Sequence, residues 1–114
     1  MTSSPRTSRS RSETEKLALS PSVADTFEFL GRPWVTQLLF LLGQRQARFS
    51  ELSQALPALS GRVLTERLRE LCAEGLVVRH VQDGPSARVT YELTERGSGL
   101  SAALRGITDW ADAV

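Results

Sequence analysis

The sequence predicts a mainly helical fold with a small β-hairpin, arranged as a winged helix-turn-helix. Two amphipathic segments, 49–57 and 60–75, are joined by a tight linker of sequence PALS. Two segments rich in β-branched and aromatic residues, 76–82 and 88–93, follow directly and flank a turn that contains Gly and Pro. Helix, tight turn, helix and hairpin in that order describe a helix-turn-helix with a β-wing.

Length and composition are those of one ordinary globular domain. The chain has 114 residues, of which 40% are hydrophobic and 24% charged, and its formal net charge is +1. Residues 1–16 hold four basic and two acidic side chains, a local charge of +2, so the remainder sums to −1. A surface for nucleic acid must therefore be a local patch of positive charge.

Several classes of site and location are not expected. Cys72 and His80 are the only residues of their types, so one chain cannot form an internal disulfide and is not expected to build a zinc site. No glycine-rich phosphate loop or nucleophile–base set is present, and we expect no cofactor and no enzymatic activity. Without an apolar run near 18 residues or a secretory signal, we expect a cytoplasmic protein with no membrane partner.

Residues 1–16 are predicted to be a disordered basic tail, and residues 17–114 to form the winged helix domain. The tail is rich in Ser and Arg and carries no large apolar side chain after the first methionine, so it has nothing to bury. Arg6, Arg9 and Arg11 are open to two interpretations, an arm that contacts DNA or a solvated tail.

The first two helices are predicted over 20–31 and 32–44. Ser22 is the expected N-cap of the first helix, and Pro33 suits the first position of the second. Each segment has a glycine near its end, which is typical of a helix stop. Apolar residues surround the second helix, which predicts burial nearly all round.

The third and fourth helices are the predicted helix-turn-helix pair. Ser50 is the expected cap of the short third helix, and Pro57 ends it. Ser60 is the expected cap of the fourth helix, which runs to Gly75, a natural residue after a helix end.

The fourth helix has an apolar face and a charged face at about 100° per residue. The core stripe consists of Leu64, Leu68 and Leu71. The outward face carries Arg62, Thr65, Glu66 and Arg69. Arg67 lies nearer the core edge, where its stem can pack and its charged end can pair with an acidic neighbour.

The outward face is open to two interpretations. It is a solvated surface with pairs such as Arg62–Glu66, or it reads the major groove, which the N-terminal half of such a helix enters. Arg binds guanine or phosphate in a bidentate manner, and Glu66 can accept from a cytosine amine. The hairpin that follows favours DNA reading.

The predicted wing, 76–93, places basic residues near its turn. A basic hairpin contacts the DNA backbone or enters the minor groove. Arg88 stands beside the turn and is the better phosphate candidate, whereas for Arg79 an ion pair within the domain is a serious alternative.

A last helix is predicted after Thr94, its expected cap. Its apolar stripe consists of Leu100, Ala103, Leu104, Ile107, Trp110, Ala111 and Val114. The stripe exceeds what one small domain needs, which favours a dimer interface over packing on the first helix of the same chain alone.

Several spaced motifs resemble those of the HxlR-type regulators, a branch of the MarR-like winged-helix transcription factors. These motifs are Arg48-Phe49 with Glu51-Leu52, Leu64-Thr65 with Arg67-Leu68, Gly75-Leu76-Val77, and Tyr91 with Leu93-Thr94 and Gly97. The resemblance covers residues 17–114. It implies a homodimer that binds a palindromic operator through the fourth helix, with the first and last helices as the dimer interface.

Candidate site residues follow from the faces and from the resemblance. The candidates for double-stranded DNA are Arg48, Ser60, Arg62, Thr65, Glu66, Arg69 and Arg88. The candidates for the dimer interface are Phe27, Leu100, Leu104, Ile107, Trp110 and Ala111. In many family members a Cys-Pro pair precedes the first helix and can sense oxidants; here Ser20-Pro21 stands in its place, and serine forms no thiolate. The wing holds one residue more than the common family pattern between Pro85 and Val89, so wing contacts carry over less directly.

The sequence leaves two further functions open. A protein-interaction module would expose an apolar outward face on the fourth helix, whereas this face is polar and charged. A small-molecule effector would bind between the dimer helices and the DNA-binding part, near Trp34, Phe27 or Trp110, although these aromatic residues also suit a core.

Overall fold

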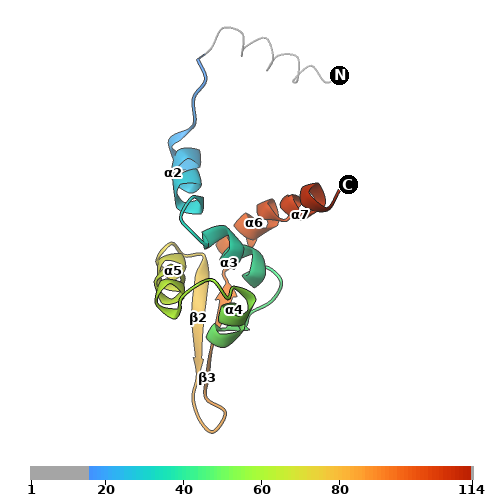
Figure 1. Cartoon of the computed structure of the whole chain (residues 1–114). Coiled ribbons are helices and arrows are strands. Elements are labelled where there is room, and N and C mark those ends of the chain that lie inside the picture. The colour runs from blue at the N-terminus through green and yellow to red at the C-terminus, as the bar shows by residue number, and fades with distance from the viewer. Residues whose placement is uncertain (1–15, 114) are drawn as a thin grey trace.

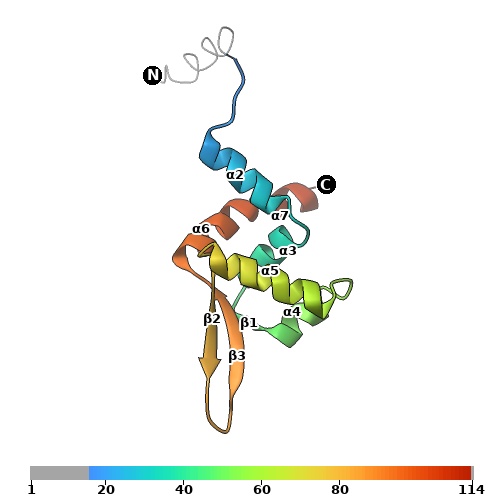
Figure 2. The ribbon, with the colours of Figure 1, turned by 90° about the vertical axis from the view of Figure 1, so that its left-hand side faces the viewer.

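The computed structural model describes residues 16–113, a helical body with a projecting two-stranded wing and two terminal helical arms (Figures 1 and 2). The elements are α2 (Pro21–Leu30), α3 (Val35–Leu42), β1 (Ala47–Arg48), α4 (Phe49–Ala55), α5 (Gly61–Ala73), β2 (Val77–Gln82), β3 (Arg88–Leu93), α6 (Glu95–Leu104) and α7 (Gly106–Asp112). The pair α4 and α5 with the β2–β3 hairpin confirms the winged helix-turn-helix. The predicted tail through Arg6, Arg9 and Arg11, and Val114 of the apolar stripe, lie outside the described residues.

Helix α2 begins earlier than predicted. Its N-cap is Ser20, whose Oγ accepts from the Val23 N–H at 3.3 Å, so the predicted cap Ser22 was wrong. Pro21 is the first helical residue, a position where its missing N–H leaves no hydrogen bond unmade. Ser22 instead lies inside the first turn.

Helix α3 begins later than predicted, because Trp34 has a backbone conformation that is not helical. Trp34 has a φ of 74°, in the left-handed region, and α3 starts at Val35 rather than at Pro33. One side of α3 is fully buried and most of the other side is half-buried, with Gln37 the exposed residue among its eight, which agrees with the predicted burial nearly all round.

Helix α4 is capped by a carboxylate rather than by Ser50, which lies inside the helix. The Arg48 N–H donates to Glu51 Oε1 at 2.9 Å, and Arg45 holds the same carboxylate at 3.0 and 3.2 Å. The pKa of Glu51 is lowered to about 2, first by the Arg45 hydrogen bond and then by the Arg48 backbone N–H. Glu51, the third residue of α4, therefore accepts the hydrogen bond of the backbone N–H at the start of this helix.

The sheet has three strands in the antiparallel order β1-β3-β2, one strand more than predicted. The hairpin register runs from Val77 opposite Leu93 to Gln82 opposite Arg88. Strand β1 adds only the pairs of Ala47 with Tyr91 and of Arg48 with Thr90. The wing base is thus anchored to the segment before α4.

Both predicted boundaries of the fourth helix are confirmed. Ser60 Oγ accepts from the Val63 N–H at 3.2 Å, and Gly75 follows α5 with a φ of 74°. The predicted core stripe is buried together with residues of α3, β1, α4 and β2. This core consists of Val35, Leu38, Leu39, Leu42, Ala47, Leu52, Leu59, Leu64, Leu68, Leu71, Leu76 and Val77.

Replacing Ser60 by Ala is expected to lower the free energy of unfolding by about 1 kcal/mol, because the Val63 N–H loses its acceptor. Ser50→Ala is the matched control, since Ser50 is an exposed residue inside α4 and caps nothing. Urea unfolding followed by circular dichroism measures both variants. An equal loss in the two would contradict the assignment of the caps.

The predicted last helix is two helices. Thr94 caps α6 as expected, its Oγ1 accepting from the Gly97 N–H at 3.0 Å, but the helix breaks at Arg105 before Gly106. Glycine is a poor helix former, which suits the break. The buried Ser101 donates its Oγ–H to the Leu39 carbonyl at 3.1 Å and ties α6 to α3. No helix within residues 16–113 is long and apolar enough to cross a membrane.

Candidate nucleic-acid interface

Helix α5 lies beside the base of the wing (Figure 2). Its polar face is exposed to solvent. Arg62, Thr65, Glu66 and Arg69 of this face are exposed, as predicted from the helical spacing. The opposite face is fixed by the buried Leu64, Leu68 and Leu71. The rotation of α5 about its axis is therefore set by core packing.

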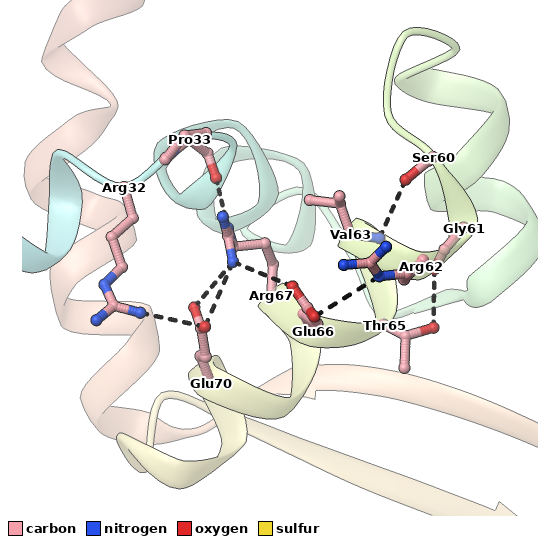
Figure 3. Close-up of polar contacts among 10 residues, drawn as sticks. All are labelled: Arg32, Pro33, Ser60, Gly61, Arg62, Val63, Thr65, Glu66, Arg67 and Glu70. Carbon is pink, nitrogen blue, oxygen red and sulfur yellow. Dashed lines mark hydrogen bonds and ion pairs between the residues drawn. The ribbon is translucent and has the colours of Figure 1, made fainter.

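Arg62 is highly exposed on this face and weakly paired. Its side chain is 86% exposed, and its Nε lies 4.0 Å from the Glu66 carboxylate, at the outer limit of an ion pair (Figure 3). An exposed pair at this distance contributes little stability. The guanidinium can therefore exchange Glu66 for a base edge or a phosphate at small cost.

Two hydroxyls of the predicted site are used by their own helix. Thr65 Oγ1 donates to the Gly61 carbonyl at 2.9 Å, and Ser60 Oγ accepts from the Val63 N–H (Figure 3). The Thr65 oxygen keeps acceptor capacity toward solvent, and its methyl group is available for an apolar contact.

Arg67 lies at the core edge, as predicted. Its side chain is 16% exposed, its Nε donates to the Pro33 carbonyl at 2.9 Å, and its Nη1 donates to Glu70 at 3.3 Å. Figure 3 shows Arg67 directed toward Pro33, away from Arg62. This arginine therefore holds α5 against the segment before α3.

A groove of about 580 Å³ separates the C-terminal half of α5 from the wing. Its lining consists of Thr65, Leu68, Arg69, Cys72, Val77, Val78, Arg79 and Tyr91. Across residues 16–113 no ion pair is recorded for Arg79, so the alternative of an ion pair within the domain is not supported. Arg79 thus joins Arg69 in one basic groove, although sequence reasoning left it out of the site.

The wing register separates Arg48 and Arg88 from this groove. Arg79 is paired with Tyr91, whereas Arg88 is paired with Gln82 and Arg48 with Thr90. Paired residues in an antiparallel sheet share a face and successive residues alternate, so Arg48 and Arg88 belong to the other face of the sheet. The predicted DNA-binding residues therefore do not all lie in one patch, because Arg48 and Arg88 are on the other face of the sheet.

His80 of the wing and Cys72 of α5 each have a defined partner or environment. His80 Nε2 lies 2.7 Å from Glu92 Oε1, so the only histidine is engaged within the wing. Burial raises the pKa of the half-buried Cys72 thiol, and nearby Arg79 partly opposes this shift. Among the described residues, no group of three or more His, Cys, Asp or Glu side chains could hold a metal ion.

The terminal helices expose the large apolar side chains that were predicted as an interface. Phe27 is 58% exposed, Ile107 54% and Trp110 81%, and α2 contains no buried residue. Ala111 is also exposed, whereas Leu100 and Leu104 are half-buried against the core. The apolar stripe is thus divided, with α6 packing inward and α7 facing solvent.

An apolar groove of about 420 Å³ lies between α3 and α7. Its lining includes Phe40, Leu41, Leu56, Leu104, Ile107 and Ala111. The three aromatic residues proposed for an effector site are not part of this lining, and Trp34 packs against the core.

Known proteins share both the sequence and the fold. A family model described as HxlR-like helix-turn-helix matches residues 29–114. The HTH-type transcriptional regulator YvaP of Bacillus subtilis (strain 168) is 42% identical over 93 residues, which cover 82% of this chain and 86% of YvaP. The reduced form of the transcriptional regulator YodB from B. subtilis has a TM-score of 0.74 at 33% identity, covering 83% of this chain and 93% of that one.

A second YodB structure is described as quinone-bound, with a TM-score of 0.70 at 32% identity, covering 84% of this chain and all of that one. These relatives are regulators of transcription and not enzymes. The extent of the family match, the identity to YvaP and the winged helix fold all point to the same family. The chain belongs to the HxlR-like helix-turn-helix family of transcriptional regulators.

Proposed function

We propose that the chain binds a palindromic operator as a homodimer, with α5 in the major groove and the wing on the backbone or in the minor groove. The observation that carries the proposal is the basic outward surface formed by Arg62 and Arg69 on α5 and by Arg79 at the wing base. The surface is local, as a net charge of +1 requires.

The reading residues are those of the outward face of α5. Arg62 and Arg69 bind guanine edges or phosphates, and the Thr65 methyl group or Glu66 carboxylate contacts the edges of neighbouring bases. Ser60 caps the helix and leaves the N-terminal N–H groups of α5 directed toward a phosphate. Arg69 and Arg79 bind the backbone where it crosses the groove between α5 and the wing.

Arg88 and Arg48 bind DNA outside this groove. Arg88 is exposed beside the wing turn, where it reaches the backbone or the minor groove. Arg48 is exposed on the same face of the sheet, at the start of α4, and binds the backbone flanking the half-site. Both contacts position the protein and carry no direct base information.

The homodimer is formed by α2 together with α6 and α7. The exposed Phe27, Ile107 and Trp110, with Ala111, form the contact, and the half-buried Leu100 and Leu104 support it from the protomer core. A twofold axis relating two such arms presents the two α5 helices to successive half-sites about one helical turn apart.

A small-molecule effector is proposed for the apolar groove between α3 and α7, by analogy with the quinone-bound form of YodB. This effector would act without a thiol before α2, where Ser20 stands. Because α7 forms one wall of the groove, an occupant would alter the position of a proposed dimer helix.

Removing either outward arginine is expected to weaken operator binding. Arg62→Ala and Arg69→Ala should each cost about 1–3 kcal/mol on the cognate site, because each deletes a bidentate or phosphate contact. Gel shifts against the DNA upstream of the gene, repeated over a range of salt concentrations, measure the loss and the salt dependence.

Arg96→Ala is the matched control, because it removes one positive charge from α6, away from the basic groove. Unchanged affinity in both α5 variants would contradict the assigned face. Absence of any reproducible DNA binding by the wild type would favour a protein-interaction module instead.

A further inference from the structure

Five charged side chains form a line of contacts, here called the Arg32–Arg62 line, from the turn before α3 to the outward face of α5. Arg32 Nη1 lies 3.1 Å from Glu70 Oε2, which lies 3.3 Å from Arg67 Nη1 (Figure 3). Arg67 Nη1 lies 4.0 Å from Glu66 Oε1, and Glu66 Oε2 lies 4.0 Å from Arg62 Nε. Positive and negative groups alternate along this line, so each acidic residue bridges two arginines.

Arg67 is the most buried of the three arginines in the line. Its side chain is 16% exposed, whereas those of Arg32 and Arg62 are 53% and 86% exposed. The hydrogen bond from Arg67 Nε to the Pro33 carbonyl, at 2.9 Å, is charge-assisted. The link between α5 and the turn therefore depends on Arg67 more than on the exposed pairs at either end.

The turn that Arg67 contacts is strained. Trp34 has a φ of 74°, a conformation that bulky residues rarely adopt and that persists only when its surroundings hold it. Because of this conformation, α3 begins at Val35, and its first hydrogen bond runs from the Leu38 N–H to the Trp34 carbonyl at 3.0 Å. The Pro33 carbonyl lies before that hydrogen bond and accepts from Arg67 instead.

The direction of α2 depends on this same turn. Helix α2 has no buried residue, and Figure 1 shows it pointing away from the helical body. Only Phe29 and Leu30, at its C-terminal end, pack against the core. Whatever fixes the turn therefore fixes the direction in which the arm leaves the DNA-binding part.

We propose that Arg67 is a positioning residue that fixes the direction of α2 relative to α5, and thereby the half-site spacing that the dimer accepts. The second part rests on the proposed function, in which α2 is a dimer arm. If two α2 arms meet at the twofold axis, an error in their direction displaces the two α5 helices relative to each other. Arg67 then governs which operators fit, although it contacts no base itself.

The first test needs no DNA. Arg67→Met keeps an apolar stem but removes every donor, and hydrogen exchange followed by mass spectrometry should show about tenfold faster exchange across residues 29–38. The matched control is Arg45→Met, which removes a similar arginine, paired at 3.0 Å with Glu51 and bonded at 2.8 Å to the Gln46 carbonyl, away from this turn. Unchanged exchange in Arg67→Met, or a uniform rise over the whole chain, would overturn the positioning role.

The second test measures half-site spacing. Operators with one base pair added or removed between half-sites are compared with the native operator for wild type, Arg67→Met and Arg45→Met. The preference for the native spacing should fall about fivefold or more in Arg67→Met alone, with partial recovery in Arg67→Lys, which restores a charged donor. An equal loss of affinity for every spacing would show that Arg67 only stabilises the fold.

The two tests separate this inference from the proposed function. If the wild type binds no operator while the Arg67→Met turn still exchanges faster, the DNA-binding dimer is wrong and the control of α2 by Arg67 stands. If the wild type binds its operator and neither readout changes in Arg67→Met, the inference is wrong and the proposed function stands.

Discussion

Gly97→Ala is expected to lower the free energy of unfolding by about 3 kcal/mol. A Cβ at this position would overlap the Leu76 carbonyl oxygen and lie 2.9 Å from the Leu76 carbonyl carbon. Both are backbone atoms, so no side chain can rotate away to make room. The same Leu76 carbonyl accepts from the Thr94 N–H at 3.0 Å, so a displacement would also disturb the start of α6.

Gly99→Ala is the matched control for this prediction. It lies on the same helix, and an added Cβ would meet nothing within 4 Å. Because alanine is the better helix former, this variant should be neutral or more stable by up to about 1 kcal/mol. Thermal and urea unfolding of the two variants should move in opposite directions, and similar shifts would show that the close approach of α6 to Leu76 is not present in solution.

Trp110→Glu is expected to convert the proposed dimer to monomers and to weaken operator binding about 100-fold. The Trp110 side chain is 81% exposed in the protomer, so the substitution creates no cavity in the core. It places a charge in the proposed interface, where a large aromatic side chain would be buried. Operator binding falls because two linked half-site contacts become independent.

Light scattering coupled to size exclusion, together with gel shifts, checks this result. Ala102→Glu is the control, since Ala102 is an exposed α6 residue two positions along from Leu100 and therefore off the apolar stripe. This variant should stay dimeric and bind normally. A dimeric Trp110→Glu protein would move the interface away from α7.

The helices with strong periodicity and clear caps were predictable, and the elements set by tertiary contacts were not. Helix α5 was found with its cap Ser60, its buried leucines and its outward arginines, because each depends on local spacing. Strand β1 was missed because two residues carry no periodicity, and the pairing of Ala47 with Tyr91 is determined by the fold around it.

Of the three helix starts that were predicted wrongly, those of α3 and α4 have related reasons. The left-handed Trp34 gives no signal in the sequence, since glycine or asparagine is the usual residue for that conformation. At the start of α4, the carboxylate of the capping residue Glu51 is held by Arg45, six residues earlier. No local sequence pattern indicates this pairing.

The candidate site was predictable on the helix and less so on the wing. Helical spacing was enough to place Arg62 and Arg69 outward. The hairpin register could not be predicted, so the sharing of a groove by Arg79 and Arg69, and the place of Arg88 on the other face of the sheet, were not foreseen. Side-chain direction in a strand changes with each residue, and only the observed pairing resolves it.

The two-residue strand β1 has a consequence for the order in which the chain folds. Its pairing of Ala47 with Tyr91 closes a loop of more than forty residues that contains α4, α5 and β2. Two ladder pairs cannot offset the entropy of closing such a loop until the elements inside it have formed. The three-stranded sheet is therefore completed late in folding, and its β1 edge is among the first contacts to open when the domain unfolds.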